Sequence, residues 1–280
     1  MKTERNVIFK GAKGRYSVAD FYFANHLNAH TIIFVHGYKG FKDWGAWDLV
    51  AKYFQTNGFN FVAFNMSHNG GTVENPIDFP DLDAFAENRY SYELKDLKQI
   101  IDLTIFKFDV EGKNISLIGH SRGGAIAMLS ALNDAVANVV TWAAIDSIED
   151  RFPKGEMLSE WKKTGVRFVK NSRTNQMMPH KFNMYLDWVE NKDLLNIQSS
   201  VSQESSKVNF LHVHGDKDEA VDFSAASQIS AWSGGDVFIV EGAGHTFGGF
   251  HPYTEKVMPE HLEMVCATTI EFINKALNSF

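Results

Sequence analysis

The segment 115–124 reads Ile-Ser-Leu-Ile-Gly-His-Ser-Arg-Gly-Gly and places one serine where it could act as a nucleophile. Its first four residues have the length and branching of a buried strand, and residues 124–129 have the pattern of a buried helix. A Gly-x-Ser-x-Gly turn between such elements predicts a strained corner that exposes the Ser121 hydroxyl. Glycine suits positions 119 and 123, because a Cβ there would crowd the neighbouring strand and helix. The alternative is a plain glycine-rich loop.

A serine hydroxyl needs a base in contact with it and a carboxylate that orients the base. The segments 214–221 and 242–247 contain such side chains, and each follows an apolar strand-like run. Ligands bind at the carboxyl ends of strands in open α/β sheets, so we expect both segments near Ser121. The helix after Ser121 points its N-terminal N–H groups at the serine. The backbone N–H of Arg122 is therefore a candidate donor of an oxyanion hole.

Several side chains compete for the roles of acid and base. The candidate carboxylates are Asp146, Asp216 and Asp218. Among the eleven histidines, His245 lies in a glycine-flanked loop that would let the imidazole swing over Ser121. The histidines expected to have structural roles are His36, His120, His212 and His214. His251 is not assigned a role.

The remaining pattern indicates how these residues are held. Apolar runs predict strands at 7–9, 16–23, 31–35, 59–66, 115–118, 139–145, 208–213 and 237–240, and helical spacing predicts helices at 47–54, 91–106 and 259–277. The first two strands should form a hairpin around glycines 11–14. Residues 67–88, rich in Asn, Gly, Asp and Pro, predict a long loop. Strands that alternate with helices imply a mostly parallel sheet covered on both faces.

The alternation breaks once. No strand-like run lies between Ile145 and Val208, so we interpret residues 150–206 as a helical cap inserted into the sheet order. So many large apolar residues must bury against something. We expect them to cover Ser121 and form the substrate pocket, with Tyr185 and Trp188 among its walls. The alternative is that this apolar face forms a homodimer.

Composition limits the class of protein. The chain has 280 residues, 44% of them hydrophobic, which suits one domain over 1–280 that includes the insertion. A net charge of -7 without a basic stripe argues against nucleic acid as a partner. Cys266 is alone, so no disulfide forms within the chain. The sequence contains no apolar run of ~18 residues, the length that would predict a membrane span. We expect a cytoplasmic protein that needs no metal or cofactor.

These motifs together resemble the α/β-hydrolase superfamily. The matching pieces are His36-Gly37, the corner at 119–123, His-Gly-Asp-x-Asp-x-x-Val at 214–221 and Gly-x-Gly-His at 242–245. Within the superfamily the chain is most similar to the branch of dienelactone hydrolases, cinnamoyl (feruloyl) esterases and acylaminopeptidase-like enzymes. The resemblance implies an α/β fold with an eight-stranded, mostly parallel sheet, helices on both faces and a helical cap.

The resemblance also implies roles for individual residues. Asp218, three residues after the glycine of its motif, would be the acid, and His245 would be the base. The backbone N–H of Tyr38 would be the second oxyanion donor. The chain departs from the family pattern at residues 65–72, where a loop that begins with Asp in many relatives begins with Asn65. Any family role that depends on that loop is therefore in doubt.

The implied activity is that of a serine hydrolase that cleaves small-molecule carboxylic esters through an acyl-enzyme, without a cofactor or metal. One alternative is an acylaminopeptidase-like peptidase or amidase. Another is a hydrolase homologue that binds a ligand without turning it over. The Arg122 side chain has two interpretations, because a buried guanidinium needs a carboxylate partner. That partner is either a residue of the protein or an acidic substrate.

Overall fold

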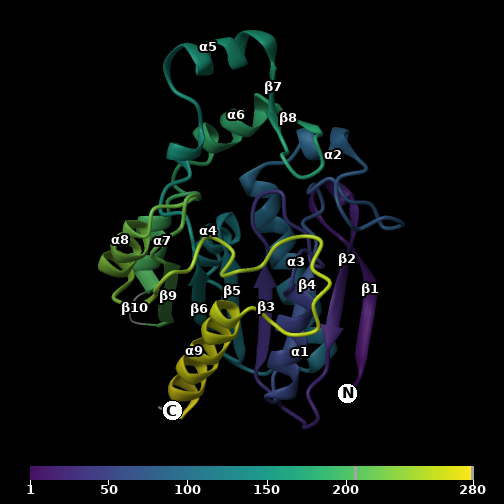
Figure 1. Ribbon diagram of the computed structural model, residues 1–280, viewed down its shortest axis with the longest axis vertical. Coiled ribbons are helices and arrows are strands. Elements are labelled where there is room, and N and C mark those ends of the chain that lie inside the picture. Colours follow the sequence, from purple (N-terminus) through teal and green to yellow (C-terminus); the bar gives the residue numbers. More distant parts are fainter. Residues whose placement is uncertain (205–206, 279–280) are drawn as a thin grey trace.

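A central sheet organises the computed structural model, which describes residues 1–204 and 207–278 (Figure 1). Its strands are β1 (Thr3–Lys10), β2 (Tyr16–Tyr22), β3 (Thr31–Val35), β4 (Asn60–Phe64), β5 (Ile115–His120), β6 (Val136–Trp142), β9 (Asn209–Gly215) and β10 (Asp236–Val240). They lie in the order β1-β2-β4-β3-β5-β6-β9-β10. β1 and β2 pair antiparallel, as do β2 and β4, and the other neighbours pair parallel. The predicted eight-stranded, mostly parallel sheet is confirmed.

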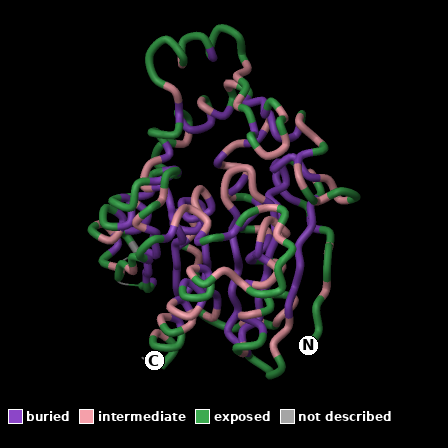
Figure 2. Tube along the Cα trace, in the orientation of Figure 1, coloured by how far each residue is buried: buried purple, intermediate pink, exposed green. Residues whose placement is uncertain are grey.

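Helices cover both faces of the sheet. They are α1 (Trp47–Thr56), α3 (Tyr90–Phe108), α4 (Arg122–Leu129), α7 (Ile197–Glu204), α8 (Ser224–Ser233) and α9 (Glu260–Leu277), with a 3₁₀ turn, η1 (Ala12–Gly14), between β1 and β2. Successive residues of a strand point to opposite faces. In β3, Ile33 packs with α3, α4, α7 and α8, whereas Ile32 packs with α1 and α9. The central strands are therefore buried on both sides (Figure 2), which explains their continuous apolar runs.

The chain between β6 and β9 rises above the carboxyl ends of the strands (Figure 1). It contains η2 (Glu149–Arg151), α5 (Gly155–Thr164), β7 (Val166–Lys170), β8 (Met177–Lys181) and α6 (Asn183–Glu190). We call residues 149–190 the overhang. Its helix α5 is mostly exposed (Figure 2), apart from Trp161, which is 3% exposed, and the half-buried Leu158.

The expectation that no strand lies between Ile145 and Val208 was wrong. β7 and β8 pair antiparallel, with Val166 opposite Lys181 and Phe168 opposite Pro179. Each strand is five residues long, and polar residues interrupt both, so neither forms the apolar run of a buried strand. Proline is also unusual inside a strand, but it is tolerated in a two-stranded ribbon, where each strand is an edge.

The predicted cap also extends too far along the chain. α7 packs against α4 and α8 and buries Ile197 and Val201 in the core beside the sheet. It therefore belongs to the helical layer rather than to the overhang. Residues 205 and 206, which end the predicted cap, lie outside the described residues.

The predicted long loop at 67–88 forms a platform for the hairpin β7–β8. It includes a short helix, α2 (Leu82–Ala86), which begins where Asp81 accepts a hydrogen bond from Ala84 N at 2.9 Å. α2 lies against β8. Ion pairs join Lys181 to Glu87 and Arg173 to Asp78. The overhang is thus tied to the body of the protein at its far end as well as at its roots.

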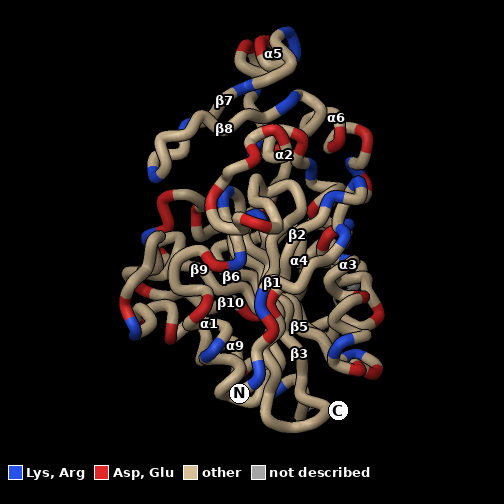
Figure 3. Tube along the Cα trace, turned by 90° about the vertical axis from the view of Figure 1, so that its right-hand side faces the viewer, with Lys and Arg blue, Asp and Glu red and all other residues tan. Residues whose placement is uncertain are grey.

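Two further features of the described chain bear on earlier expectations. Cys266, the lone cysteine, is fully buried in α9. No helix among residues 1–204 and 207–278 is both long and apolar enough to cross a membrane. On the side seen in Figure 3, Lys and Arg are interspersed with Asp and Glu over much of the trace, whereas the segment around α2 carries acidic residues only.

Candidate active site

Ser121 occupies a strained corner between β5 and α4. Its backbone has φ 56° and ψ −121°, a conformation that side-chain-bearing residues rarely adopt. A Cβ on Gly119 would lie 2.3 Å from the Gly123 carbonyl oxygen, and one on Gly123 would lie 2.1 Å from that of Val35. Only glycine fits at these two positions. The tight turn predicted from the sequence is therefore present.

Asp218 and His245 form a hydrogen-bonded pair. Asp218 Oδ2 lies 2.8 Å from His245 Nδ1, and Asp218 Oδ1 accepts hydrogen bonds from the backbone N–H groups of Ala220 and Val221 at 2.8 and 2.9 Å. Burial alone would raise the pKa of Asp218, but hydrogen bonds from His214, His245 and Val221 N outweigh burial and hold its pKa below the usual range. A carboxylate at Nδ1 fixes the proton there and leaves His245 Nε2 free to accept another.

The other two candidate acids lie elsewhere. Asp216 Oδ1 accepts a hydrogen bond from Gly242 N at 2.6 Å, and its Oδ2 lies 3.3 Å from Lys217 Nζ. Asp146 lines a separate cavity together with Trp188. Among the three candidates, Asp218 is the one that contacts His245.

His214 lies at the same carboxylate, which the sequence reasoning did not foresee. Its Nε2 is 3.1 Å from Asp218 Oδ2 and 3.0 Å from the Val221 carbonyl oxygen. Both neighbours are acceptors, so Nε2 carries the proton and donates. The sequence led us to expect structural roles for both His214 and His212. His212 does have a separate network, with Thr141 Oγ1 at 2.9 Å and Ser233 Oγ at 2.8 Å. The i, i+4 spacing of His214 and Asp218 was the signal that could have separated the two histidines.

Three more histidines order the loops around Ser121. His36 Nδ1 donates to the Gly37 carbonyl at 2.9 Å, and its Nε2 accepts from Met66 N at 3.1 Å. His120 Nε2 donates to the His245 carbonyl at 2.9 Å and packs beneath that loop. His251, which had no assigned role, accepts from Gly45 N at 2.9 Å through Nδ1. It holds the loop that follows β3.

Two backbone N–H groups are available beside Ser121. Gly37 approaches the corner so closely that a Cβ on it would lie 2.9 Å from Ser121 Cβ. Tyr38 follows Gly37 in the chain, and Arg122 N is the first amide of α4. Neither amide donates a hydrogen bond to another described residue. Both are therefore free to bind a negatively charged oxygen.

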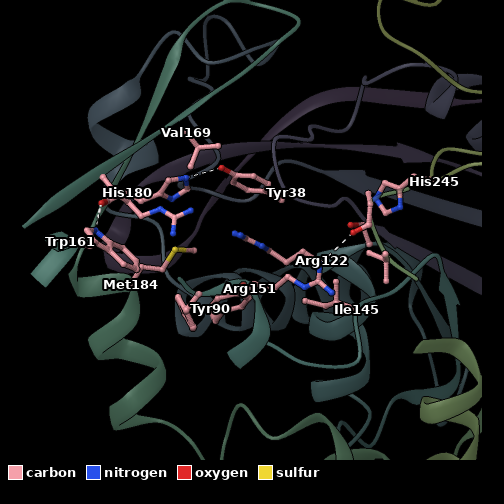
Figure 4. Close-up of a pocket in the computed structure, with 15 residues that line it drawn as sticks. Tyr38, Tyr90, Arg122, Ile145, Arg151, Trp161, Val169, His180, Met184 and His245 are labelled. Carbon is pink, nitrogen blue, oxygen red and sulfur yellow. Dashed lines mark hydrogen bonds between the residues drawn. The ribbon is translucent and has the colours of Figure 1, made fainter. Parts of the chain in front are cut away.

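Two cavities meet at Ser121 and His245. The larger, about 360 Å³, lies beneath the overhang, and Trp161, His180 and Met184 form its far wall (Figure 4). The smaller, about 220 Å³, lies between the loop at 37–47 and the loop of His245. Tyr185 and Trp188, expected in the pocket wall, instead pack behind it on Phe152.

Ser121 and His245, the expected nucleophile and base, are not hydrogen-bonded to each other in this structure. Within the described chain the Ser121 hydroxyl makes no hydrogen bond, although Ser121 and His245 line the same two cavities. Catalytic hydrogen bonds commonly tighten only when a substrate is bound. Across residues 1–204 and 207–278, no three or more His, Cys, Asp and Glu side chains gather in a way that could hold a metal ion.

Comparison with known proteins identifies the family. Residues 32–255 match the model of the alpha/beta hydrolase family, a range that contains every candidate site residue. The chain belongs to this family.

Individual relatives are distant. The "Putative esterase/lipase 2" of Mycoplasma pneumoniae is 33% identical over 110 residues, a match that spans 39% of this chain and 35% of that relative's length. Est1E from Butyrivibrio proteoclasticus is 18% identical, with a TM-score of 0.71 over 99% of this chain and all of that one. GrgF from Penicillium sp. sh18 is 16% identical, with a TM-score of 0.72 over 99% of each chain. At these identities the two solved structures establish the fold alone.

Proposed function

We propose that this protein is a serine hydrolase that cleaves carboxylic esters through an acyl-enzyme. The observation that carries the proposal is the 2.8 Å hydrogen bond between Asp218 and His245, at the mouth of the cavities that Ser121 lines. A carboxylate, an imidazole and a serine in this order are the parts of a catalytic triad. The esterase/lipase relative, although matched over only part of its length, is consistent with this class of reaction.

Each residue then has a defined task. His245 Nε2 removes the proton as Ser121 Oγ attacks the ester carbonyl, and Asp218 holds the imidazole tautomer and stabilises the imidazolium. The N–H groups of Tyr38 and Arg122 bind the oxyanion of the tetrahedral intermediate. His245 next gives its proton to the leaving alcohol. Water, activated by the same imidazole, then hydrolyses the acyl-enzyme and regenerates Ser121.

The two cavities suit the two arms of a small ester, one on each side of the reacting carbonyl. The overhang acts as a cap over the larger cavity, where Trp161 and Met184 supply an apolar wall. One solved structure with this fold, Est1E from Butyrivibrio proteoclasticus, has ferulic acid bound. Its TM-score is 0.69 and its identity is 19%, so it offers a ligand of suitable size rather than a known substrate.

A fluorophosphonate probe tests the proposal directly. Mass spectrometry should find the adduct on Ser121, and Ser121→Ala should lower kcat on p-nitrophenyl acetate by ~10⁶-fold. Ser159→Ala, at an exposed serine of α5, is the matched control and should keep full activity. An adduct on another residue, or an active Ser121→Ala protein, would contradict the mechanism.

The same preparation separates the alternatives. An esterase should cleave p-nitrophenyl acetate far faster than the matching p-nitroanilide, whereas an amidase should cleave both. A protein that only binds ligands should cleave neither and should form no adduct with the probe.

A further inference from the structure

The larger cavity beside Ser121 has an unbalanced charge. Three arginines line it, Arg122, Arg151 and Arg167, and no Asp or Glu is among the described residues of its wall. The rest of the wall is largely aromatic or aliphatic. A cavity for a purely apolar acyl chain has no need of three guanidinium groups. The Arg122 side chain is 12% exposed, and burying its charge costs free energy unless it is paired, whereas Arg167 is half-buried and Arg151 is exposed.

Arg122 extends from the first turn of α4 into this cavity (Figure 4). Its guanidinium lies between two rings, 4.5 Å from the centre of Tyr38 and 4.8 Å from that of Tyr90. Its one protein acceptor within the described chain is Glu93 Oε1, 3.4 Å from Nη1. A guanidinium has five N–H donors, so most of those of Arg122 remain available to a ligand.

Glu93 neutralises the positive charge of Arg122 only in part. This carboxyl is buried behind the wall and also accepts a hydrogen bond from Asn88 at 2.7 Å. Its burial raises the pKa of Glu93, which opposes the negative form that would neutralise the arginine. The structural ion pair considered from the sequence is therefore present, but it does not account for the other two arginines.

Arg151 and Arg167 have no carboxylate within 4 Å among the described residues. Arg151 reaches only the Ala220 carbonyl, at 3.4 Å, and Arg167 lies over the Trp161 ring at 5.2 Å. Burial, together with the charges of Arg122, Arg167 and Lys39, lowers the pKa of His180 to about 3. Cations from three separate elements, α4, η2 and β7, thus line the cavity, with Arg151 on the side of Ile145 (Figure 4).

We propose that this cavity binds an anionic group of the substrate, so that the preferred esters carry a carboxylate at the end of an apolar arm. The inference rests on the proposed ester hydrolysis and deepens it. A planar carboxylate accepts two parallel hydrogen bonds from a guanidinium, and the aromatic walls would hold the arm between that carboxylate and the ester. The carboxylate belongs to the acyl arm or the alcohol arm, whichever enters this cavity.

Equilibrium binding tests the inference without catalysis. In the Ser121→Ala protein, 3-phenylpropionate should bind at least ~10-fold more tightly than its neutral isostere 3-phenylpropionamide, by titration calorimetry. Arg167→Met should remove most of that preference, as should Arg151→Met if the first variant does not fold. Arg122 is left unchanged because its backbone N–H belongs to the proposed oxyanion hole. Lys163→Gln, at an exposed lysine of the same overhang, is the charge-matched control.

Kinetics on the wild-type protein identify the arm. Monomethyl adipate is compared with methyl 5-carbamoylpentanoate for the acyl arm, and 4-acetoxybutyrate with 4-acetoxybutyramide for the alcohol arm. In one of the pairs kcat/KM should favour the anion by at least ~10-fold, and Arg167→Met should reduce the ratio.

The outcomes separate the two proposals. Ester cleavage that favours the neutral member of each pair, or equal binding of 3-phenylpropionate and its amide, overturns the inference and leaves the hydrolase intact. Selective binding of the carboxylate by a protein that cleaves no ester and forms no adduct overturns the proposed function and leaves the anion site.

Discussion

At the scale of residues, a single carboxylate oxygen, Asp218 Oδ2, contacts two histidines of the candidate site. It lies 2.8 Å from His245 Nδ1 and 3.1 Å from His214 Nε2, so two imidazoles donate to it. The contact with His245 orients the proposed base. The contact with His214 holds the Asp218 carboxylate in place. We therefore expect His214 to act through Asp218 as a positioning residue.

The first prediction compares the three candidate acids. Asp218→Asn should lower kcat by ~10⁴-fold, because the amide no longer holds the required tautomer of His245. Asp216→Asn and Asp146→Asn should change kcat little, since neither side chain contacts the imidazole. Steady-state kinetics on p-nitrophenyl acetate measure all three. If Asp146→Asn were the most damaging, the acid would have been assigned to the wrong strand.

The second prediction concerns His214. His214→Gln should lower kcat by roughly 10-fold at unchanged KM, because Asp218 loses one charge-assisted hydrogen bond. With fewer donors, the carboxylate should stabilise the imidazolium of His245 more strongly, so the acidic limb of the kcat/KM profile should move to higher pH. His212→Gln, two residues earlier on β9, should leave that limb in place. If the two variants had the same pH dependence of kcat/KM, His214 would contribute only packing.

At the scale of elements, the overhang supplies part of the wall of the larger cavity, and we expect it to influence specificity without any change in the sheet. It is held by the platform at 67–88 and by the hydrogen bond from Tyr38 to His180, 2.7 Å long, which joins it to the loop of the proposed oxyanion hole. The Trp161 indole donates to the His180 carbonyl at 2.8 Å. Wall and oxyanion loop are thus fixed relative to each other by this chain of contacts.

The third prediction tests Trp161 as the wall of the cavity. Trp161→Ala should raise kcat/KM for longer acyl chains roughly 10-fold relative to p-nitrophenyl acetate, because each methylene in an apolar pocket is worth a few-fold or more in selectivity. Met157→Ala on the same helix is the control, since Met157 is 70% exposed. Trp188→Ala should shift the preference less, because that ring packs behind the wall. A larger shift in Trp188→Ala than in Trp161→Ala would contradict this placement.

Buried, neutral histidines determine the response of the whole molecule to acid. Burial lowers the pKa of His30, His36, His68 and His212 to about 4, and that of His120 and His180 to about 3. The unfolded chain, with histidine pKa values near 6.5, binds more protons than the folded one between pH 6.5 and about 4. Burial also raises the pKa of Asp96 to about 6 and raises the pKa of Glu93, and these two carboxyls act in the opposite direction.

The fourth prediction follows from that balance. The free energy of unfolding should be greatest above pH 6.5 and should fall as the pH drops toward 4, because six histidines outweigh two carboxyls, Glu93 and Asp96. Urea unfolding at pH 7 and pH 5 measures the difference. It should shrink by about 2 kcal/mol in His212→Gln and remain unchanged in His26→Gln, whose side chain is exposed. If stability were constant over this range, the histidines would not be neutral in the folded state.

The sequence by itself determined the sheet and the corner that carries Ser121. Both depend on local rules: continuous apolar runs for strands buried on two faces, and glycine where a Cβ would lie 2.1–2.3 Å from backbone oxygens. It also located Asp218 and His245 through motifs, although their roles remain predictions until the variants are measured. The family and the eight-stranded sheet are confirmed.

The tertiary structure alone decided which distant side chains meet. The hairpin β7–β8 was missed because its short, half-exposed strands are stabilised by α2 and the platform rather than by an apolar run of their own. The sequence likewise could not show that Arg122, Arg151 and Arg167 line one cavity, or that His214 reaches Asp218. Local patterns record how each segment buries its own apolar face. The neighbours of a charged side chain depend on how the overhang and the loops meet at the carboxyl ends of the strands. The sequence of one segment does not determine that arrangement.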